Sequence, residues 1–290
     1  MDKNRSDKDG FYVYKAVKMI TEAYKLLRTE FEKCIQLVDK NEDYEAYARE
    51  KYRHSLQVMG AGNYLIKHIA WLQNKSPEFI ELVKTAILLH DIARFQEIAL
   101  LQQGYKNFDH GIAGSILLQS TNLFNDVRIW LPIKHHGHLI KDLYSDVEYQ
   151  NIEDKSLQDD VRRICFIIRD ADKIANLHMI VHEPKMRWLF WEKKHIDLSV
   201  DGKISDMTEK YAFGSTTIPR NFKATPADCI VSFLSWYKDI NYQCAIDFCS
   251  ILSITTGMLQ ILDEYCIDEA FKQKFTAHLN SYLQGRQFFN

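Results

Sequence analysis

The feature that most constrains the fold of this chain is the helical spacing of its apolar residues, which recur three or four positions apart. That spacing places apolar side chains on one face of a helix, where they can pack against a core. Five prolines and 11 glycines in 290 residues leave little material for long irregular segments. We therefore predict an all-α protein, with helices over 12–38, 44–73, 79–91, 109–119, 127–136 and 157–182 and helical spacing again from 227 to the C-terminus.

Polar, proline and glycine residues separate these helices. Ser76-Pro77 is typical of a helix start, with serine as the cap and proline in the first turn, and Asp109 can cap another helix. Glu183-Pro184 indicates a break, and the stretch 196–226 predicts turns or a short hairpin. We expect a disordered tail over 1–10 and a single domain over 11–290, with its motif core at 44–182 and a C-terminal helical extension at 183–290.

Composition and charge argue against several classes of protein. The formal net charge is -2, which argues against a broad nucleic-acid surface. The apolar runs AILL and ICFII are far too short to span a membrane, and the polar start MDKNRSDKDG does not resemble a signal peptide. The six cysteines form no CxxC pair, so we expect reduced thiols and a cytoplasmic protein.

The pair His90-Asp91, near the end of the apolar run ILLHDIARF, is the first candidate for chemistry. His90 lies three and four residues after Ile87 and Ala86, so it projects from the buried face of that helix. Arg94 follows one turn later. A buried histidine, carboxylate and arginine are costly unless they satisfy one another or hold an ion. The alternative is a core histidine bonded to a backbone carbonyl, with Asp91 capping the helix, and the dipeptide alone does not exclude it.

Two further residues have positions that suit the same site. His54 lies four residues before Val58, on the inward face of its own helix. Asp172 lies four residues after Ile168, at the flank of an apolar face, whereas Asp170 points toward the other flank; whether Asp170 assists stays open. The alternatives are a structural buried histidine and a solvated salt-bridge cluster, because arginines occur nearby at positions 162, 163 and 169.

These candidates combine into one mixed set of imidazole and carboxylate ligands from three helices: His54, His90, Asp91 and Asp172. Such ligands suit a divalent metal ion (Mn, Fe, Ni, Co, Zn or Mg), and ligand type does not choose among them. A set of this kind leaves coordination positions open for water and substrate, as hydrolysis requires.

Three more histidines fall between these ligands in the chain. His110 follows Asp109 at a helix start, and His135 and His136 stand before Gly137 in IKHHGH. They could bind a second metal ion, contact phosphate or protonate a leaving group. The alternative is a set of surface histidines in a loop, which is the interpretation we prefer for His138.

With these motifs in place, the chain resembles the HD-domain superfamily of metal-dependent phosphohydrolases. The resemblance is carried by RHSLQV, LLHDIARF, DHGIAGSILL, IKHHG and RDADKIANL, which lie within residues 44–180, and WYKDINY resembles the C-terminal part of stand-alone bacterial HD proteins. It implies an HD-type helical bundle with an N-terminal helix. It also implies metal binding by His54, His90, Asp91 and Asp172, with His110, His135 and His136 as ligands of a possible second metal.

The resemblance names a family without naming a substrate. The HDxxED pattern of guanosine tetraphosphate hydrolases is absent, because Arg94-Phe95 occupy those positions. The GYP signature of cyclic-di-GMP phosphodiesterases and the HDIGHPPFGH type of deoxynucleotide triphosphohydrolases are absent as well. The HDIxRF variant is similar to predicted phosphohydrolases of unassigned substrate.

The activity that the resemblance implies is hydrolysis of a phosphoester or phosphoanhydride by metal-activated water. A nucleotide is the expected substrate, and the chain could form a homo-oligomer. The residues expected to take part in catalysis are Asp91, Arg94, His110, His135 and Lys173, with Arg94 and Lys173 neutralising phosphate charge. The alternative is a sensor module that keeps the ligands and binds a nucleotide or a partner without turnover.

Overall fold

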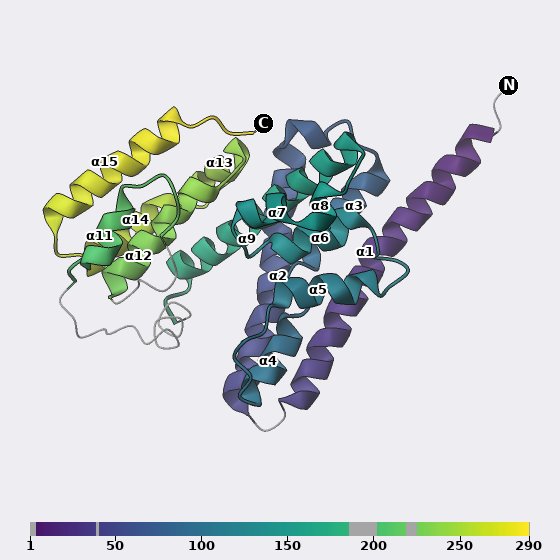
Figure 1. The fold of residues 1–290 in the computed structure, drawn as a ribbon, viewed down its shortest axis with the longest axis horizontal. Helices are drawn as coiled ribbons and strands as arrows, with labels where there is room; N and C mark the ends of the chain where they lie inside the picture. The colour runs from purple at the N-terminus through teal and green to yellow at the C-terminus, as the bar shows by residue number, and fades with distance from the viewer. Residues whose placement is uncertain (1–3, 39–40, 186–201, 219–224, 290) are drawn as a thin grey trace. The chain divides into compact units, whose positions relative to one another are not determined.

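The structure is a computed structural model that describes residues 4–38, 41–185, 202–218 and 225–289 (Figure 1). Within these ranges the chain is helical and has no strand, apart from one isolated parallel bridge between Tyr242 and Phe289. The predicted all-α fold is therefore confirmed. The chain forms two compact units, residues 1–172 and 173–290, whereas the sequence predicts one domain with an extension from 183.

The first unit contains the helices that carry the candidate ligands. In chain order they are α1 (Asn4–Leu37), α2 (Glu42–His68), η1 (Ala70–Leu72), α3 (Pro77–Leu88), α4 (Arg94–Gln102), α5 (His110–Gln119), α6 (Val127–His135), α7 (Ile140–Ser145), α8 (Val147–Gln150) and α9 (Lys155–His182), whose last part belongs to the second unit. The helix α1 begins within the stretch that the sequence predicts as a tail.

The central element of the first unit is α3, which packs against α1, α2 and α6. Its buried residues include Val83, Ala86 and Ile87, so the apolar spacing seen in the sequence faces the core of the unit. The start of α3 is as predicted, because Ser76 accepts a hydrogen bond from the backbone N–H of Phe79 at 3.3 Å. The helix α5 packs closely on α6 and also contacts α4.

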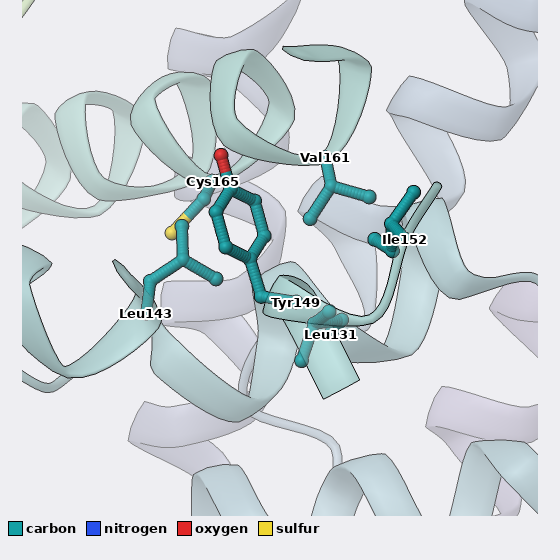
Figure 2. Packing of buried hydrophobic residues seen from close by; sticks show 6 residues of the cluster. All are labelled: Leu131, Leu143, Tyr149, Ile152, Val161 and Cys165. Atoms are coloured by element: carbon teal, nitrogen blue, oxygen red, sulfur yellow. The ribbon is translucent and has the colours of Figure 1, made fainter. Parts of the chain in front are cut away.

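A cluster of buried apolar residues fixes α6 against α7, α8 and the first half of α9 (Figure 2). Figure 2 shows Leu131 of α6 and Val161 and Cys165 of α9 around the ring of Tyr149. Leu143 and Ile152 complete the cluster. Since α6 carries candidate ligands at its C-terminal end and α9 carries Asp172 beyond this cluster, the packing helps to fix how these ligands lie relative to each other.

The second unit contains the end of α9 and a group of shorter helices: α11 (Asp206–Ala212), α12 (Pro226–Leu234), η3 (Ser235–Asp239), α13 (Gln243–Ile251), α14 (Ile254–Tyr265) and α15 (Glu269–Gly285). Its buried residues include the aromatic side chains Phe233, Tyr237, Tyr242 and Phe275. Among the described helices none is long and apolar enough to cross a membrane alone; α13 and α14 meet that test only as a pair, bent by 66°.

One stretch differs from the predicted hairpin. Within 196–226 the structure describes 202–218 and 225–226, and it places the helix α11 there. Ser205 caps this helix by accepting a hydrogen bond from the backbone N–H of Thr208 at 3.3 Å. Asp206 and Glu209 lie in its first turn, where the helix dipole favours acidic residues. The turn-forming composition of this stretch thus predicted turns at a place where the structure has a short capped helix.

Candidate metal centre

The pair His90-Asp91 lies in a tight turn that joins α3 to α4. The sequence predicts a helix through residue 91, but α3 ends at Leu88 and α4 begins at Arg94. Backbone bonds from Ile92 to Leu89 and from Arg94 to Asp91, at 3.0 and 2.8 Å, close this turn. His90 is 0% exposed and Asp91 3%, so the turn directs both side chains into the protein.

The first group of candidate ligands joins two helices and the turn between α3 and α4. His54 on α2 and Asp172 on α9 meet at 2.9 Å between Nε2 and Oδ1, and His90 Nε2 lies 3.8 Å from the same carboxylate oxygen. The three ligand atoms lie within 4.8 Å of one another, which is compatible with a single metal ion between them. These residues are far apart in the sequence, so only the fold brings them together.

The second group shares His90 with the first and adds Asp91 and His136. Their ligand atoms also lie within 4.8 Å of one another. The two oxygens of Asp91 face different partners: Oδ2 lies 3.8 Å from His90 Nε2, and Oδ1 lies 3.3 Å from His136 Nε2. Asp91 could therefore hold a divalent ion together with His90 and His136.

Hydrogen bonds at the rear of the rings fix the tautomers of two of these histidines. His90 Nδ1 donates to the carbonyl of Ile87 at 2.9 Å, and His136 Nδ1 donates to the carbonyl of Ile133 at 2.7 Å. Each bond places the proton on Nδ1 and leaves the lone pair of Nε2 directed into the centre. This is the arrangement in which histidine binds a metal through Nε2.

His110, the first residue of α5, completes the centre on the side of α4. Its Nε2 lies 3.2 Å from Asp91 Oδ1 and 3.4 Å from His136 Nε2, and it accepts a hydrogen bond from Arg94 Nη2 at 2.8 Å. Its Nδ1 lies 3.4 Å from Glu97 Oε2. Asp109 caps α5, as the sequence predicts, by accepting from a backbone N–H of the first turn at 3.0 Å.

The residues present fit a divalent metal ion. Among the described side chains, His90 Nε2 and Asp91 Oδ1 are buried atoms without a hydrogen-bond partner. The Nε2 lone pair of His136 faces Asp91 Oδ1 across 3.3 Å, and two acceptors so close repel each other unless a cation lies between them. The donor set of imidazole and carboxylate is one that divalent transition metals bind.

The charges of the centre also favour the binding of a cation. Burial would raise the pKa of the Asp91 carboxyl, but the Arg94 guanidinium and the facing histidines hold it well below its usual value. Burial would raise the pKa of Asp172 too, but its hydrogen bond to His54 and the charges of His54 and His90 together lower it. The ion-paired network therefore contains three carboxylates, including that of Glu97, against one guanidinium, a negative balance that divalent cations would neutralise.

Two predicted site residues, His135 and Lys173, have ion-pair partners outside the two ligand groups. His135 Nε2 pairs with Asp146 Oδ2 at 2.7 Å and belongs to neither ligand group. Neighbouring residues on a helix point about 100° apart, so α6 can turn only one of its two adjacent histidines into the centre. Lys173 Nζ pairs with Asp239 Oδ2 at 2.9 Å, within the second unit, and its expected contact with phosphate stays a prediction.

The structure also places Asp170, His138 and Asp172 differently from one another. Asp172 belongs to the first ligand group, and Asp170, which is 0% exposed, belongs to neither group. Asp170 is thus buried and is not part of a solvated cluster. His138 Nε2 contacts Asp109 Oδ2 at 2.8 Å near the surface, so it supports the start of α5 from outside the centre.

Two residues near the centre were not predicted from the sequence. Glu97, one turn after Arg94 on α4, contacts both Arg94 and His110. Lys51, one turn before His54 on α2, is mostly buried and lies within electrostatic reach of Asp91. Burial lowers the pKa of Lys51, but the carboxylates of Glu50 and Asp91 outweigh it and raise the pKa overall, so this cation stays charged. Each of these residues lies three positions from a predicted site residue on the same helix, and this helical spacing could have identified both from the sequence.

Close backbone contact holds the two histidine-bearing ends of α5 and α6 together. A Cβ atom added at Gly111 would lie 2.7 Å from the carbonyl oxygen of Lys134 and 3.2 Å from that of Ile133. Gly111→Ala is therefore expected to lower the free energy of unfolding by about 1–3 kcal/mol, because a backbone contact cannot relax easily. Gly60→Ala on α2, where nothing lies within 4 Å, should instead raise it by up to about 1 kcal/mol. Urea unfolding measures both, and equal changes would contradict the close-contact explanation.

The buried His90 makes the stability of the metal-free protein depend on pH. Burial lowers the pKa of His90 from 6.5 to about 4, and the nearby carboxylates offset only part of this effect. Between pH 6.5 and 4 the unfolded chain therefore binds a proton that the native state does not. The free energy of unfolding should fall by about 3 kcal/mol as the pH falls through this window.

Urea unfolding at several pH values in the presence of a chelator measures this dependence. His90→Asn, which keeps a donor near the Ile87 carbonyl, should lose most of the slope between pH 6.5 and 4. Equal slopes in the variant and the native sequence would show that other groups cause the dependence.

The comparisons with known proteins agree with this geometry. Residues 52–177 match the family model of the HD domain, and this range contains both ligand groups. No curated protein and no solved structure shows a significant match to the chain. Residues 52–177 are therefore similar to an HD domain, and further helices lie on both sides of this range.

Proposed function

We propose that this protein is a metal-dependent phosphohydrolase that cleaves a phosphoester or phosphoanhydride bond in a small phosphorylated substrate, a nucleotide above all. The observation that carries the proposal is the pair of ligand groups that share His90. Each group could hold a divalent ion, and His90, whose only free lone pair is on Nε2, would bind one of the two. We also propose a cytoplasmic location on the basis of the cysteine content.

The chemistry follows from what this arrangement can supply. Divalent ions bound here would provide a nucleophilic water at neutral pH and would polarise the phosphoryl oxygens. The protein residues then orient the substrate and balance its charge. Arg94 is a fixed cation, because Asp91 and Glu97 raise its pKa more than burial lowers it.

His110 lies where it could contact the phosphoryl group of the substrate. Its Nε2 lies between Arg94 and Asp91, and its Nδ1 faces Glu97. Burial lowers the pKa of His110 more than its contact with Asp91 raises it, so the ring is neutral at neutral pH. We assign it to steering the phosphoryl group, with His136 and His90 kept for metal binding.

Lys51 is the second cation that we assign to the substrate. It lies on the same face of α2 as His54 and close to Arg94. Lys51→Ala should lower kcat/KM about 10- to 100-fold, as expected for the loss of a charged hydrogen bond, and should leave the metal content unchanged. Lys67→Ala, an exposed lysine on the same helix, is the matched control. Steady-state kinetics together with metal analysis would reject the assignment if both variants behaved alike.

The experiment that tests the proposed function begins with metal analysis of the purified protein. After removal of metal with a chelator, Mn, Fe, Ni, Co, Zn and Mg are restored one at a time. Each form is then assayed on nucleoside mono-, di- and triphosphates, cyclic dinucleotides and a generic phosphodiester. Hydrolysis that depends on the restored metal supports the proposal. Metal binding without turnover on any substrate would favour a sensor, and failure to bind metal would overturn both functions.

A further inference from the structure

We infer that Arg169 is a positioning residue that holds the C-terminal end of α6 and thereby sets His136 in the metal centre. The inference rests on the proposed metal-dependent function and concerns a residue that would contact neither the metal nor the substrate. Arg169 is 4% exposed, a rare degree of burial for an arginine. Its Nη1 donates to three backbone carbonyls at the end of α6: that of His135 at 3.3 Å, that of His136 at 3.1 Å and that of His138.

The end of a helix needs such a partner. The last carbonyl groups of a helix have no partner within the helix, and they form the negative end of its dipole. The helix α6 ends at His135, and His136 is its capping residue. A buried guanidinium satisfies several of these carbonyls at once and offsets their negative charge. Its flat, branched group of donors suits this task better than the single point charge of lysine.

The capped segment is the one that presents His136 to the centre. The ring of His136 is held from behind by its hydrogen bond to Ile133 and faces Asp91 with Nε2 at 3.3 Å. Arg169 binds the carbonyl of the same residue. A small rotation of this segment would therefore move Nε2 away from Asp91 or turn His135 toward it.

The same helix supplies a metal ligand one turn later. Arg169 lies three residues before Asp172 on α9, so one segment positions a ligand of the first group directly and a ligand of the second group through α6. The apolar cluster in Figure 2 links the same two helices, because it joins Leu131 of α6 to Cys165, one turn before Arg169. Packing fixes the distance between the helices, and Arg169 fixes the rotation at the end of α6.

Variants at two arginines of α9 test the inference. Arg169→Ala should weaken binding of one of two Mn or Co ions about 10- to 100-fold, as is typical for loss of a residue that orients a ligand, and should leave the other ion bound. Arg169→Lys should fall between that variant and the native protein. Arg163→Ala, whose side chain pairs with Asp159 at 2.6 Å, is the matched control and should bind both ions normally. Calorimetric titration and the Co absorption spectrum give the two affinities.

A second readout needs no metal. Long-range proton–nitrogen spectra of the metal-free protein report the tautomer of each histidine. In Arg169→Ala the signals of His136 should lose their single Nδ1–H form, while those of His54 and His90 stay unchanged.

Unchanged affinity for both ions together with unchanged His136 signals would overturn the inference. An equal loss of both ions, with all three histidines altered, would also overturn it, because that is the pattern of general destabilisation. If Arg169→Ala does not fold, Arg169→Lys decides by the same two readouts. Absence of any metal in the native protein would reject the proposed function, and the metal-free spectra would still test the role of Arg169.

Discussion

Asp91→Asn is expected to lower the rate of hydrolysis about 1,000-fold or more and to remove at least one bound metal ion. The two oxygens of Asp91 face different parts of the centre: Oδ1 lies 3.2 Å from His110 Nε2, and Oδ2 lies 3.5 Å from Arg94 Nε. Asparagine keeps the shape of the side chain but removes its charge. It also replaces one oxygen by an amide NH2 group, which cannot bind a metal and cannot accept a hydrogen bond from Arg94.

Metal content by mass spectrometry and kinetics with the restored metal measure this effect. Asp172→Asn should behave like Asp91→Asn, because its carboxylate belongs to the first ligand group. Asp170→Asn, two residues earlier on the same helix, should keep its metal even if its stability falls, because it belongs to neither group. Loss of metal in Asp170→Asn with retention in Asp172→Asn would reverse the assignment of the two aspartates.

The positions that helical spacing determines were predictable from the sequence. His54 was expected on the inward face of its helix and is 1% exposed, and the structure brings it to 2.9 Å from Asp172. Caps at Ser76 and Asp109 were predictable because a capping side chain acts on its own helix within three residues. Such features depend on local geometry, which can be predicted from a single sequence.

The features that were not predictable depend on tertiary partners. Lys173 was expected beside the phosphate because it follows Asp172, yet its partner Asp239 lies far along the chain. The turn that carries His90 has no glycine or proline to mark it; the helix is replaced there by bonds that span three residues. The contacts of Arg169 were not predictable either, because its acceptors are backbone carbonyls of another helix, which sequence patterns do not reveal.

The rotation of α6 is the clearest case, because two adjacent histidines differ only in the direction in which they point. The side chain of His135 contacts Asp146 at 2.7 Å, and Arg169 donates hydrogen bonds to the backbone carbonyls of His135 and His136. These contacts come from two segments that both follow α6 in the sequence. The order IKHHGH is compatible with either histidine in the centre, and the three-dimensional contacts select His136.

His136→Asn and His135→Asn are therefore expected to differ sharply. Asparagine at position 136 keeps a donor for the Ile133 carbonyl but removes Nε2, so the second ligand group should lose its ion and hydrolysis should fall about 100- to 1,000-fold. His135→Asn breaks the contact with Asp146 outside the centre and should keep both ions.

Metal stoichiometry and the rate with excess metal distinguish the two variants, and thermal unfolding shows whether either change reflects loss of fold. His135 lies at the same helix end but outside both ligand groups, so its substitution controls for disturbance of α6 itself. If His135→Asn lost the ion and His136→Asn retained it, α6 would have to be rotated by one residue from the arrangement described here. The contacts of Arg169 with the end of α6 would then hold the opposite histidine in the centre.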